Sequence, residues 1–257
     1  MTFNIWRGGE AGGQPLEQTA AVIRAARADL VGLQETGGLE RDGRRPDNGR
    51  RIAELLGWHY LDQGGGTGVA SRHPIAGHTP QRWGVTVNLP SGRRVTHFNV
   101  HFSHAPYQPY QLLRIPYHDS PFVTSVPEVI REAHRARGGQ VERMLAELTP
   151  VLARGDAIFL TGDFNEPSHQ DWTERAVAAR ICPLAVPYPA TRRVAEAGLR
   201  DAFRVARPDE VLHPGWTWTP LTRPDDPADR HDRIDFVFFG GSGVRATACE
   251  VVGGAPD

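Results

Sequence analysis

Apolar residues recur along the chain with two different spacings. Helical spacing, with one apolar residue every three or four positions, runs through residues 16–28 and 128–152. Short apolar or alternating runs, which are typical of strands, occupy residues 1–6, 29–35, 157–161 and 233–239. Because strands come before, between and after helices, the pattern predicts an α/β or α+β fold.

Shorter elements fill the intervals between these runs. Residues 50–56 predict a helix that ends at Gly57, and residues 171–180 predict another. The glycines at 64–66 indicate a hairpin turn between two strands, and residues 82–102 a second hairpin that turns at 90–92. The helix at 128–152 is interrupted near Gly138, and irregular loops are expected at 37–48, 103–125, 182–193 and 223–232.

One strand ends in an acid and an amide two positions apart. The apolar run from residue 157 leads to Gly162, and Asp163 and Asn165 follow. If the chain stays extended, both side chains project to the same side, where they would suit a hard cation and a polar substrate oxygen. A simple turn after the strand is the alternative for these residues alone.

A second acid closes another predicted strand. Glu35 shares a face with Val31 and Leu33, so the apolar face of residues 29–35 would extend to a carboxylate. A carboxylate in that position is costly unless it is paired or binds a metal. A partnered structural glutamate remains the alternative.

Polar residues line one face of the second strand of the hairpin at 82–102. His97, Asn99 and His101 share that face, which suggests an exposed edge or the wall of a site. The loop at 103–125 follows directly and is rich in proline and aromatic residues. Its Tyr107 and Tyr110 predict a substrate-facing wall, with a packed loop as the alternative. Residues 215–218 indicate either a short strand or the edge of an aromatic pocket that would include Trp218.

Composition narrows the choice of function classes. The 257 residues contain no lysine, carry a net charge of −1 and have a pI near 6.8, unlike a protein that grips many nucleic-acid phosphates. No apolar run is long enough to span a membrane, and no signal-peptide layout is present, so we expect no stable membrane insertion. Cys182 and Cys249 form no metal-binding spacing and are expected to be free thiols.

Seven short segments in order resemble the endonuclease/exonuclease/phosphatase superfamily of metal-dependent phosphoesterases. They lie at residues 2–6, 33–35, 71–75, 99–102, 162–165, 199–203 and 232–236. The resemblance covers nearly the whole chain. It implies a four-layer α-β-β-α sandwich of two mixed sheets flanked by helices, with the site at one end.

The resemblance also implies roles for individual residues. Glu35 would bind Mg²⁺, or Mn²⁺, with Asn4 holding that metal, its water or a phosphate oxygen. Asp163 would orient or deprotonate the attacking water, Asn165 would hold the phosphate, and His101 would contact the phosphate or protonate the leaving group. Asp235 would orient a final catalytic histidine, whereas Asp201 is expected to be structural or to lie behind the site.

The superfamily ends in a Ser-Asp-His motif that does not follow Asp235 here. We therefore expect a single domain over residues 1–257 that is truncated at its C-terminus, or a chain with weakened activity. Two function classes stay open: a Mg²⁺-dependent phosphoesterase, and a non-catalytic member that binds a phosphorylated ligand. A zinc hydrolase is poorly supported, because His101 and His104 have no matching third ligand.

The expected substrate carries a phosphate ester. A small phosphodiester, a lipid head group and a nucleic acid all remain candidates, and near-neutral charge favours the first two. We expect a monomer, either cytoplasmic or secreted with a leader missing from this sequence.

Overall fold

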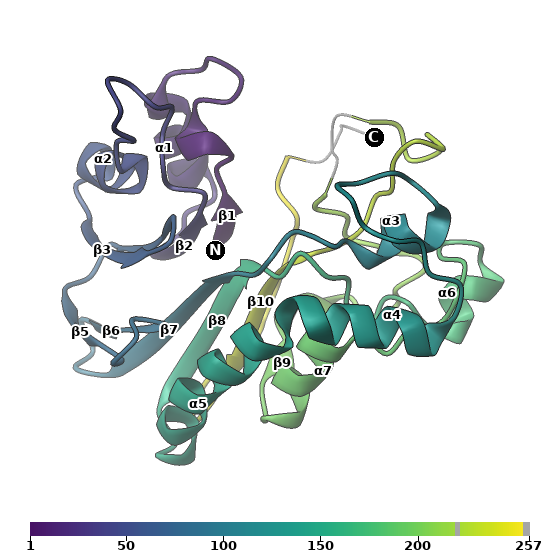
Figure 1. Cartoon of the computed structure of the whole chain (residues 1–257). Coiled ribbons are helices and arrows are strands. Elements are labelled where there is room, and N and C mark those ends of the chain that lie inside the picture. The colour runs from purple at the N-terminus through teal and green to yellow at the C-terminus, as the bar shows by residue number, and fades with distance from the viewer. Residues whose placement is uncertain (219–221, 254–257) are drawn as a thin grey trace. The chain divides into compact units, whose positions relative to one another are not determined.

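The computed structural model describes residues 1–218 and 222–253, and its elements are drawn in Figure 1. The chain divides into two compact units. The first contains residues 1–101, 146–163 and 237–244, and the second contains residues 102–145, 164–236 and 245–257. The single domain expected from the sequence stays a prediction, and its expected end at 254–257 lies outside the described residues.

The first unit contains a four-stranded sheet in the order β1-β2-β4-β3. The strands are β1 (Thr2–Asn4), β2 (Leu30–Gln34), β3 (His59–Gly64) and β4 (Thr67–Ser71). Strands β1 and β2 are parallel, and the other pairs are antiparallel. Helices α1 (Leu16–Ala25) and α2 (Asn48–Leu56) pack on this sheet through a core that includes Ile23, Leu33 and Ile52.

A six-stranded sheet has the order β5-β6-β7-β8-β10-β9. Its strands are β5 (Ile75–His78), β6 (Gly84–Asn88), β7 (Arg94–His101), β8 (Ala157–Asp163), β9 (Arg200–Asp201) and β10 (Asp235–Gly240). Strands β5, β6 and β7 are antiparallel neighbours, whereas β7 and β8 are parallel. The predicted sandwich of two mixed sheets with flanking helices is confirmed, as are both predicted hairpins.

A polar layer joins the two sheets inside the first unit. Asn99 on β7 donates to the carbonyls of Leu33 (3.0 Å) and Gly68 (3.2 Å), and Gln34 donates to Asn99 (2.6 Å). The exposed edge suggested for His97 and Asn99 is therefore wrong, since both are buried and face the opposite sheet. A side chain at Gly32 would lie 2.2 Å from the Asn99 Oδ1 atom, so only glycine allows the sheets to approach this closely.

Most of the regular secondary structure in the second unit is helical. Its helices are α3 (Gln108–Leu113), α4 (Val126–Ala133), α6 (Glu174–Ala178), α7 (Pro189–Glu196) and α8 (Ala202–Ala206). The loops expected at 103–125 and 182–193 were wrong in part, because α3 and α7 begin where proline occupies an early helical position. The predicted interruption near Gly138 is a π-helical turn, η2 (His134–Gly138), that leads into α5 (Gly139–Ala153).

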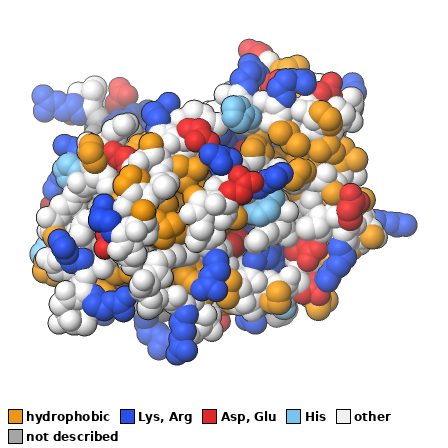
Figure 2. All heavy atoms as spheres, turned by 90° about the horizontal axis from the view of Figure 1, so that it is seen from below, with side chains coloured by type: hydrophobic (Ala, Val, Ile, Leu, Met, Phe, Trp, Pro, Cys, Tyr) orange, Lys and Arg blue, Asp and Glu red, His pale blue; other side chains and the backbone are white. Residues whose placement is uncertain are grey.

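Charged residues are spread over the surface. On the face drawn in Figure 2, blue arginine atoms lie dispersed among hydrophobic, acidic and neutral side chains. None of the helices within residues 1–218 and 222–253 combines the length and apolar character that a membrane crossing requires. Cys182 is buried and Cys249 is partly buried, and both are free thiols, as predicted.

The buried His97 makes folding stability depend on pH. Burial lowers the pKa of His97 to about 3, while its Nε2 lies 2.7 Å from the Thr161 hydroxyl. Between that pKa and the ordinary value near 6.5, the unfolded chain binds a proton that the folded chain does not. The free energy of unfolding should therefore fall as the pH drops through this window, by at most about 1.4 kcal/mol per pH unit.

Urea unfolding of wild type and His97→Gln between pH 7 and pH 4 measures this effect. The variant should show a shallower pH dependence, while His59→Gln, which changes an exposed histidine, should behave like wild type. Equal slopes in wild type and His97→Gln would contradict the assignment.

Candidate active site

The amide of Asn4 joins two carboxylates in the first unit. Its Nδ2 donates to Glu35 Oε1 and to Asp163 Oδ2, each at 3.1 Å. Asn4 is the last residue of β1, Glu35 follows β2, and Asp163 is the last residue of β8. Three positions far apart in the sequence therefore meet where three strands end.

His101 adds an imidazole to this cluster. It is the last residue of β7 and pairs in register with Asp163 on the parallel strand β8. Its Nε2 lies 3.7 Å from Asp163 Oδ2, which is too long for a hydrogen bond but close enough for electrostatic attraction when the imidazole is protonated. The side chain of Asp163 is 6% exposed and that of His101 is 21% exposed, so the imidazole can reach solvent.

The backbone turns sharply at Glu35. Strand β2 ends at Gln34, and Glu35 has a φ of 56°, an uncommon value for a residue other than glycine. The prediction that Glu35 extends the face of Val31 and Leu33 was therefore wrong, because the turn takes its side chain off the strand. The backbone N–H of Arg7 donates to Glu35 Oε2 (3.1 Å) and that of Gly8 to the Glu35 carbonyl (2.7 Å), which stabilise the turn.

The orientation of the Asn4 amide decides what it can bind. Its Oδ1 accepts the N–H of Trp6 at 3.0 Å. A turned amide would place its oxygen between two carboxylates and its NH₂ against another donor, so this orientation is the one that satisfies both ends. The predicted metal-ligand role of Asn4 does not fit, because the atoms that face the carboxylates are N–H donors. Asn4 instead holds Glu35 and Asp163 together.

The carboxylate oxygens of Glu35 and Asp163 are the kind of metal ligand that suits a magnesium ion. Two carboxylates side by side repel each other, and a divalent cation would relieve that repulsion. Among residues 1–218 and 222–253, no three His, Cys, Asp or Glu side chains gather closely enough to hold a metal by themselves. Mg²⁺ accepts one or two carboxylates and keeps its waters, whereas Zn²⁺ sites take three or four protein ligands.

Two predicted site residues belong to the second unit. Asn165 has a φ of 49°, so the extended path expected after Asp163 does not continue through it, and its Nδ2 donates to the Phe102 carbonyl at 3.0 Å. Asp235 begins β10, and its N–H donates to the Thr217 hydroxyl at 3.1 Å. The Asn165 side chain and the Asp235 backbone are each held by a hydrogen bond, and the predicted roles of these side chains stay predictions.

The aromatic residues expected to face substrate pack inside the second unit. Tyr107 is 4% exposed, and its hydroxyl donates to Asp232 at 2.8 Å. Burial and the Asp232 charge raise the pKa of Tyr107 well above its ordinary value. Tyr110 donates to Asp229 and accepts the indole N–H of Trp218 (3.1 Å). The packed-loop alternative therefore describes both tyrosines, since their hydroxyls are already bonded.

Arg233, two residues before Asp235, belongs to a buried network of charged side chains. Arg233 donates to both oxygens of Asp171 at 2.9 Å and lies 2.7 Å from Asp201. Asp201 also accepts the backbone N–H of Phe203 (2.9 Å) at the start of α8, so its expected structural role fits the geometry. Burial opposes the charge on Arg233, but the two aspartates raise its pKa above the ordinary value.

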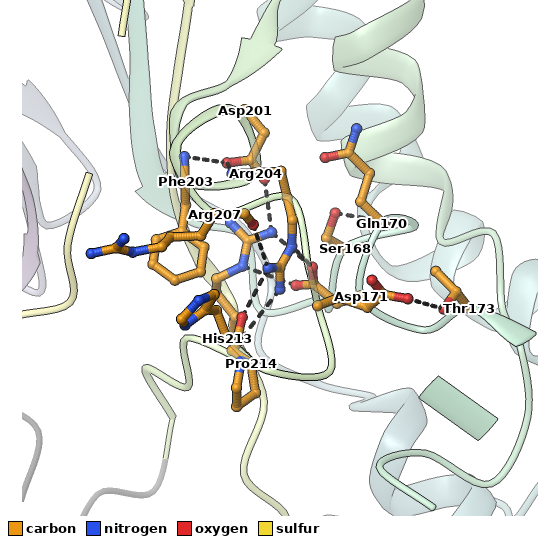
Figure 3. Close-up of polar contacts among 12 residues, drawn as sticks. Ser168, Gln170, Asp171, Thr173, Asp201, Phe203, Arg204, Arg207, His213 and Pro214 are labelled. Carbon is orange, nitrogen blue, oxygen red and sulfur yellow. Dashed lines mark hydrogen bonds and ion pairs between the residues drawn. The ribbon is translucent and has the colours of Figure 1, made fainter. Parts of the chain in front are cut away.

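A second guanidinium completes this network. Figure 3 shows Arg204 beside Asp171, to which its Nε donates at 2.6 Å. The Nη1 atom of Arg204 donates to the carbonyls of Arg207 (3.1 Å) and His213 (2.8 Å). Two arginines and two aspartates thus neutralise one another and hold three loops of the second unit.

Another buried pair was missed from the sequence. Arg137, in the π-helical turn, donates to Gln108 Oε1 (2.6 Å) and to the Pro106 carbonyl (2.8 Å), and it lies 3.7 Å from Glu166. Burial raises the pKa of Glu166 to about 7 even though Arg137 lowers it. Glu166 follows Asn165, so the pair anchors the segment after β8. The position of Arg137 beside two glycines in a helix was its only signal.

The fold and the cluster define an α/β-sandwich protein with carboxylates at the ends of its strands. Over residues 1–257 the sequence matches the Endonuclease/Exonuclease/phosphatase family, and the chain belongs to that family. The family consists of phosphoester hydrolases. An uncharacterized Caenorhabditis elegans protein, F14F9.5, is 26% identical over 261 residues, which cover 94% of this chain and 78% of that protein.

Solved structures share the fold. An endonuclease/exonuclease/phosphatase from Beutenbergia cavernae has a TM-score of 0.57 and 21% identity, covering 93% of this chain and 63% of its own length. The 3′ phosphatase NExo from Neisseria, bound to a product DNA hairpin, has a TM-score of 0.53 and 19% identity, covering 93% and 85%. An AP endonuclease from Archaeoglobus fulgidus has a TM-score of 0.50 and 17% identity, covering 93% and 84%.

Replacing Asn4 by aspartate should destabilise the first unit. The change removes the donor that Glu35 and Asp163 share and adds a third carboxylate beside them. We expect a loss of about 1–3 kcal/mol in the free energy of unfolding at pH 7, and a smaller loss at pH 4, where carboxylates take up protons. Asn88→Asp, at an exposed position, is the matched control for urea unfolding. A loss that does not shrink at pH 4 would argue against carboxylate repulsion.

Replacing Arg233 by methionine should destabilise the second unit. The change leaves Asp201 without its ion pair in a buried position and costs about 3–5 kcal/mol, measured by urea unfolding. Arg223→Met is the control, because that side chain is 85% exposed and should cost little. Equal effects of the two substitutions would show that the network contributes nothing.

Proposed function

We propose that the chain is a Mg²⁺-dependent hydrolase of phosphoester bonds. One observation carries the proposal: Asn4 holds the Glu35 and Asp163 carboxylates on a single amide, with His101 beside Asp163. This cluster would supply a base (Asp163), a proton donor (His101) and a positioning amide (Asn4) for hydrolysis of a phosphoester. Membership of the Endonuclease/Exonuclease/phosphatase family supports the same reaction class.

Glu35 would hold the Mg²⁺, with Mn²⁺ as a substitute. Glu35 and Asp163 accept hydrogen bonds from the same Asn4 amide. When bound, the ion supplies charge neutralisation on the phosphate and lowers the pKa of a coordinated water. Asn4 keeps the two carboxylates at a fixed separation. The Arg7 and Gly8 N–H groups keep the Glu35 side chain and backbone in place.

Asp163 is the proposed base. Its carboxylate would orient the attacking water and accept its proton. His101 would contact the phosphate or protonate the leaving oxygen, since its exposed edge can reach solvent. For Asn165 and Asp235, which belong to the second unit, the roles expected from the resemblance, holding a phosphate oxygen and orienting a catalytic group, remain predictions.

The substrate class is suggested by the structures that share the fold. NExo is a 3′ phosphatase bound to DNA, and another such protein is an AP endonuclease. Both names describe enzymes that act on phosphates of nucleic acid, so a nucleotide phosphoester is a candidate substrate here. The dispersed arginines and the net charge of −1 favour a short substrate over a long duplex.

Replacing Glu35 by glutamine should weaken Mg²⁺ binding at least about tenfold, because a neutral amide loses the charge attraction. Isothermal titration calorimetry of Mg²⁺ measures this in wild type, in Glu35→Gln and in the exposed control Glu54→Gln. Equal affinity in all three proteins would exclude Glu35 as the ligand.

Turnover tests the reaction itself. Wild type should hydrolyse bis(p-nitrophenyl) phosphate with Mg²⁺ and lose that activity in EDTA, and Glu35→Gln should lose most of it. Binding of the ester without hydrolysis in Mg²⁺ would favour the alternative of a non-catalytic phosphate-binding member.

A further inference from the structure

Trp6 and Arg7 lie two and three positions after Asn4, and their side chains are exposed to solvent. Trp6 is 55% exposed, although its neighbour Ile5 is buried in the core of the first unit. Exposed tryptophan is costly in water and contributes nothing to that core. A single exposed apolar residue is ordinary on a protein surface, so the exposure matters here through its place next to the carboxylate cluster.

The backbone of both residues is held in an unfavourable conformation. Trp6 has a φ of 41° and Arg7 a φ of 52°, and positive φ is a real outlier for a bulky side chain. Strain of this kind persists only where the surroundings impose it, and it gathers at ligand sites. The surroundings here are the two bonds already described, from the Trp6 N–H to Asn4 and from the Arg7 N–H to Glu35.

The segment after Arg7 is equally fixed. Asn48 donates to the Gly8 carbonyl at 2.9 Å, and a side chain at Gly8 would lie 2.6 Å from the Gly38 Cα. The backbone that carries the indole is therefore rigidly held two residues after Asn4. A rigid aromatic face beside a reactive group can stack a planar ring without a large loss of conformational entropy.

Arg7 adds a positive charge at the next position in the chain. Its side chain is exposed, and no carboxylate within the described residues forms an ion pair with it. An unpaired guanidinium matches the geometry of a phosphate. The two side chains thus offer one surface for a flat ring and one for a phosphate, and the backbone N–H groups of both residues are hydrogen-bonded to Asn4 and Glu35 of the cluster.

We propose that Trp6 and Arg7 bind a nucleotide part of the substrate, with Trp6 stacking on a base and Arg7 contacting a neighbouring phosphate. The proposal rests on the proposed phosphoester hydrolysis and deepens it, because it selects a single-stranded nucleoside phosphodiester over a lipid head group. A lipid surface would require an apolar area around Trp6, whereas residues 7–13 contain four glycines, an arginine and a glutamate.

The test compares two dinucleotide probes that differ only in their bases. The first is dithymidine phosphorothioate, and the second is the same molecule with both thymines removed. Calorimetry in Ca²⁺ measures binding without requiring turnover. Wild type should bind the first probe about tenfold or more tightly than the second, the range that stacking of one base supplies.

Four variants separate stacking from other effects. Trp6→Ala should bind the two probes equally, while Trp6→Phe should keep most of the preference because it retains a ring. Arg7→Gln should weaken both probes alike and reduce the dependence on salt. Trp216→Ala, which alters another exposed tryptophan in the second unit, should bind like wild type. Urea unfolding confirms that each variant is folded.

The outcomes distinguish the two proposals. Equal binding of the two probes by wild type, no binding of either, or an unchanged preference in Trp6→Ala overturns the base-stacking proposal even if the enzyme hydrolyses phosphoesters. A Trp6-dependent preference without any hydrolysis in Mg²⁺ supports base stacking and contradicts the proposed reaction. Trp6-dependent binding to phosphatidylglycerol vesicles, without a preference between probes, overturns base stacking in favour of a lipid surface.

Discussion

The candidate site depends on one amide group between two acids. Two carboxylates repel each other, and in a partly buried position that repulsion would drive them apart or force one to take up a proton. The NH₂ group of Asn4 prevents this by donating one hydrogen to Glu35 and the other to Asp163. Its oxygen is satisfied by Trp6, so the amide has no better alternative. A bound cation would balance the charge of the Glu35 and Asp163 carboxylates.

The strands that carry this site are themselves held by polar contacts. Asn99 links the two sheets through Leu33, Gly68 and Gln34, and Gly32 permits the close approach. A buried polar layer of this kind is stable only when each member finds its partners. It fixes the register between sheets more sharply than apolar packing would, because a shift by one residue would leave donors unpaired. Because the register is fixed, the positions of the strand ends next to Glu35 and Asp163 are fixed as well.

Charge is buried in the second unit as well. Arg233 and Arg204 are neutralised by Asp171 and Asp201, and Arg137 faces Glu166 in another part of the unit. Buried ion pairs add little net stability, but they specify geometry, since removing one partner leaves an uncompensated charge. Each pair lies next to a predicted functional segment: Arg233 precedes Asp235, and Glu166 follows Asn165. These networks hold the backbone next to Asn165 and Asp235.

Much of the fold follows from local sequence. The strand that begins at residue 157, the hairpin with its turn at 90–92 and the helix that ends at Gly57 were predicted because apolar spacing and turn residues act over a few positions. The candidate residues at strand ends were found in the same way, with the help of the family resemblance.

Only the tertiary structure determined the backbone conformation, burial and contacts of those residues. Glu35 leaves its strand at a positive φ, His97 and Asn99 turn inward, and Tyr107 is buried against Asp232. Asn4 became the bridge between acids 31 and 159 positions away. No local pattern encodes such contacts, because they depend on which distant strands meet and on which donors remain for each acceptor once the sheets have packed.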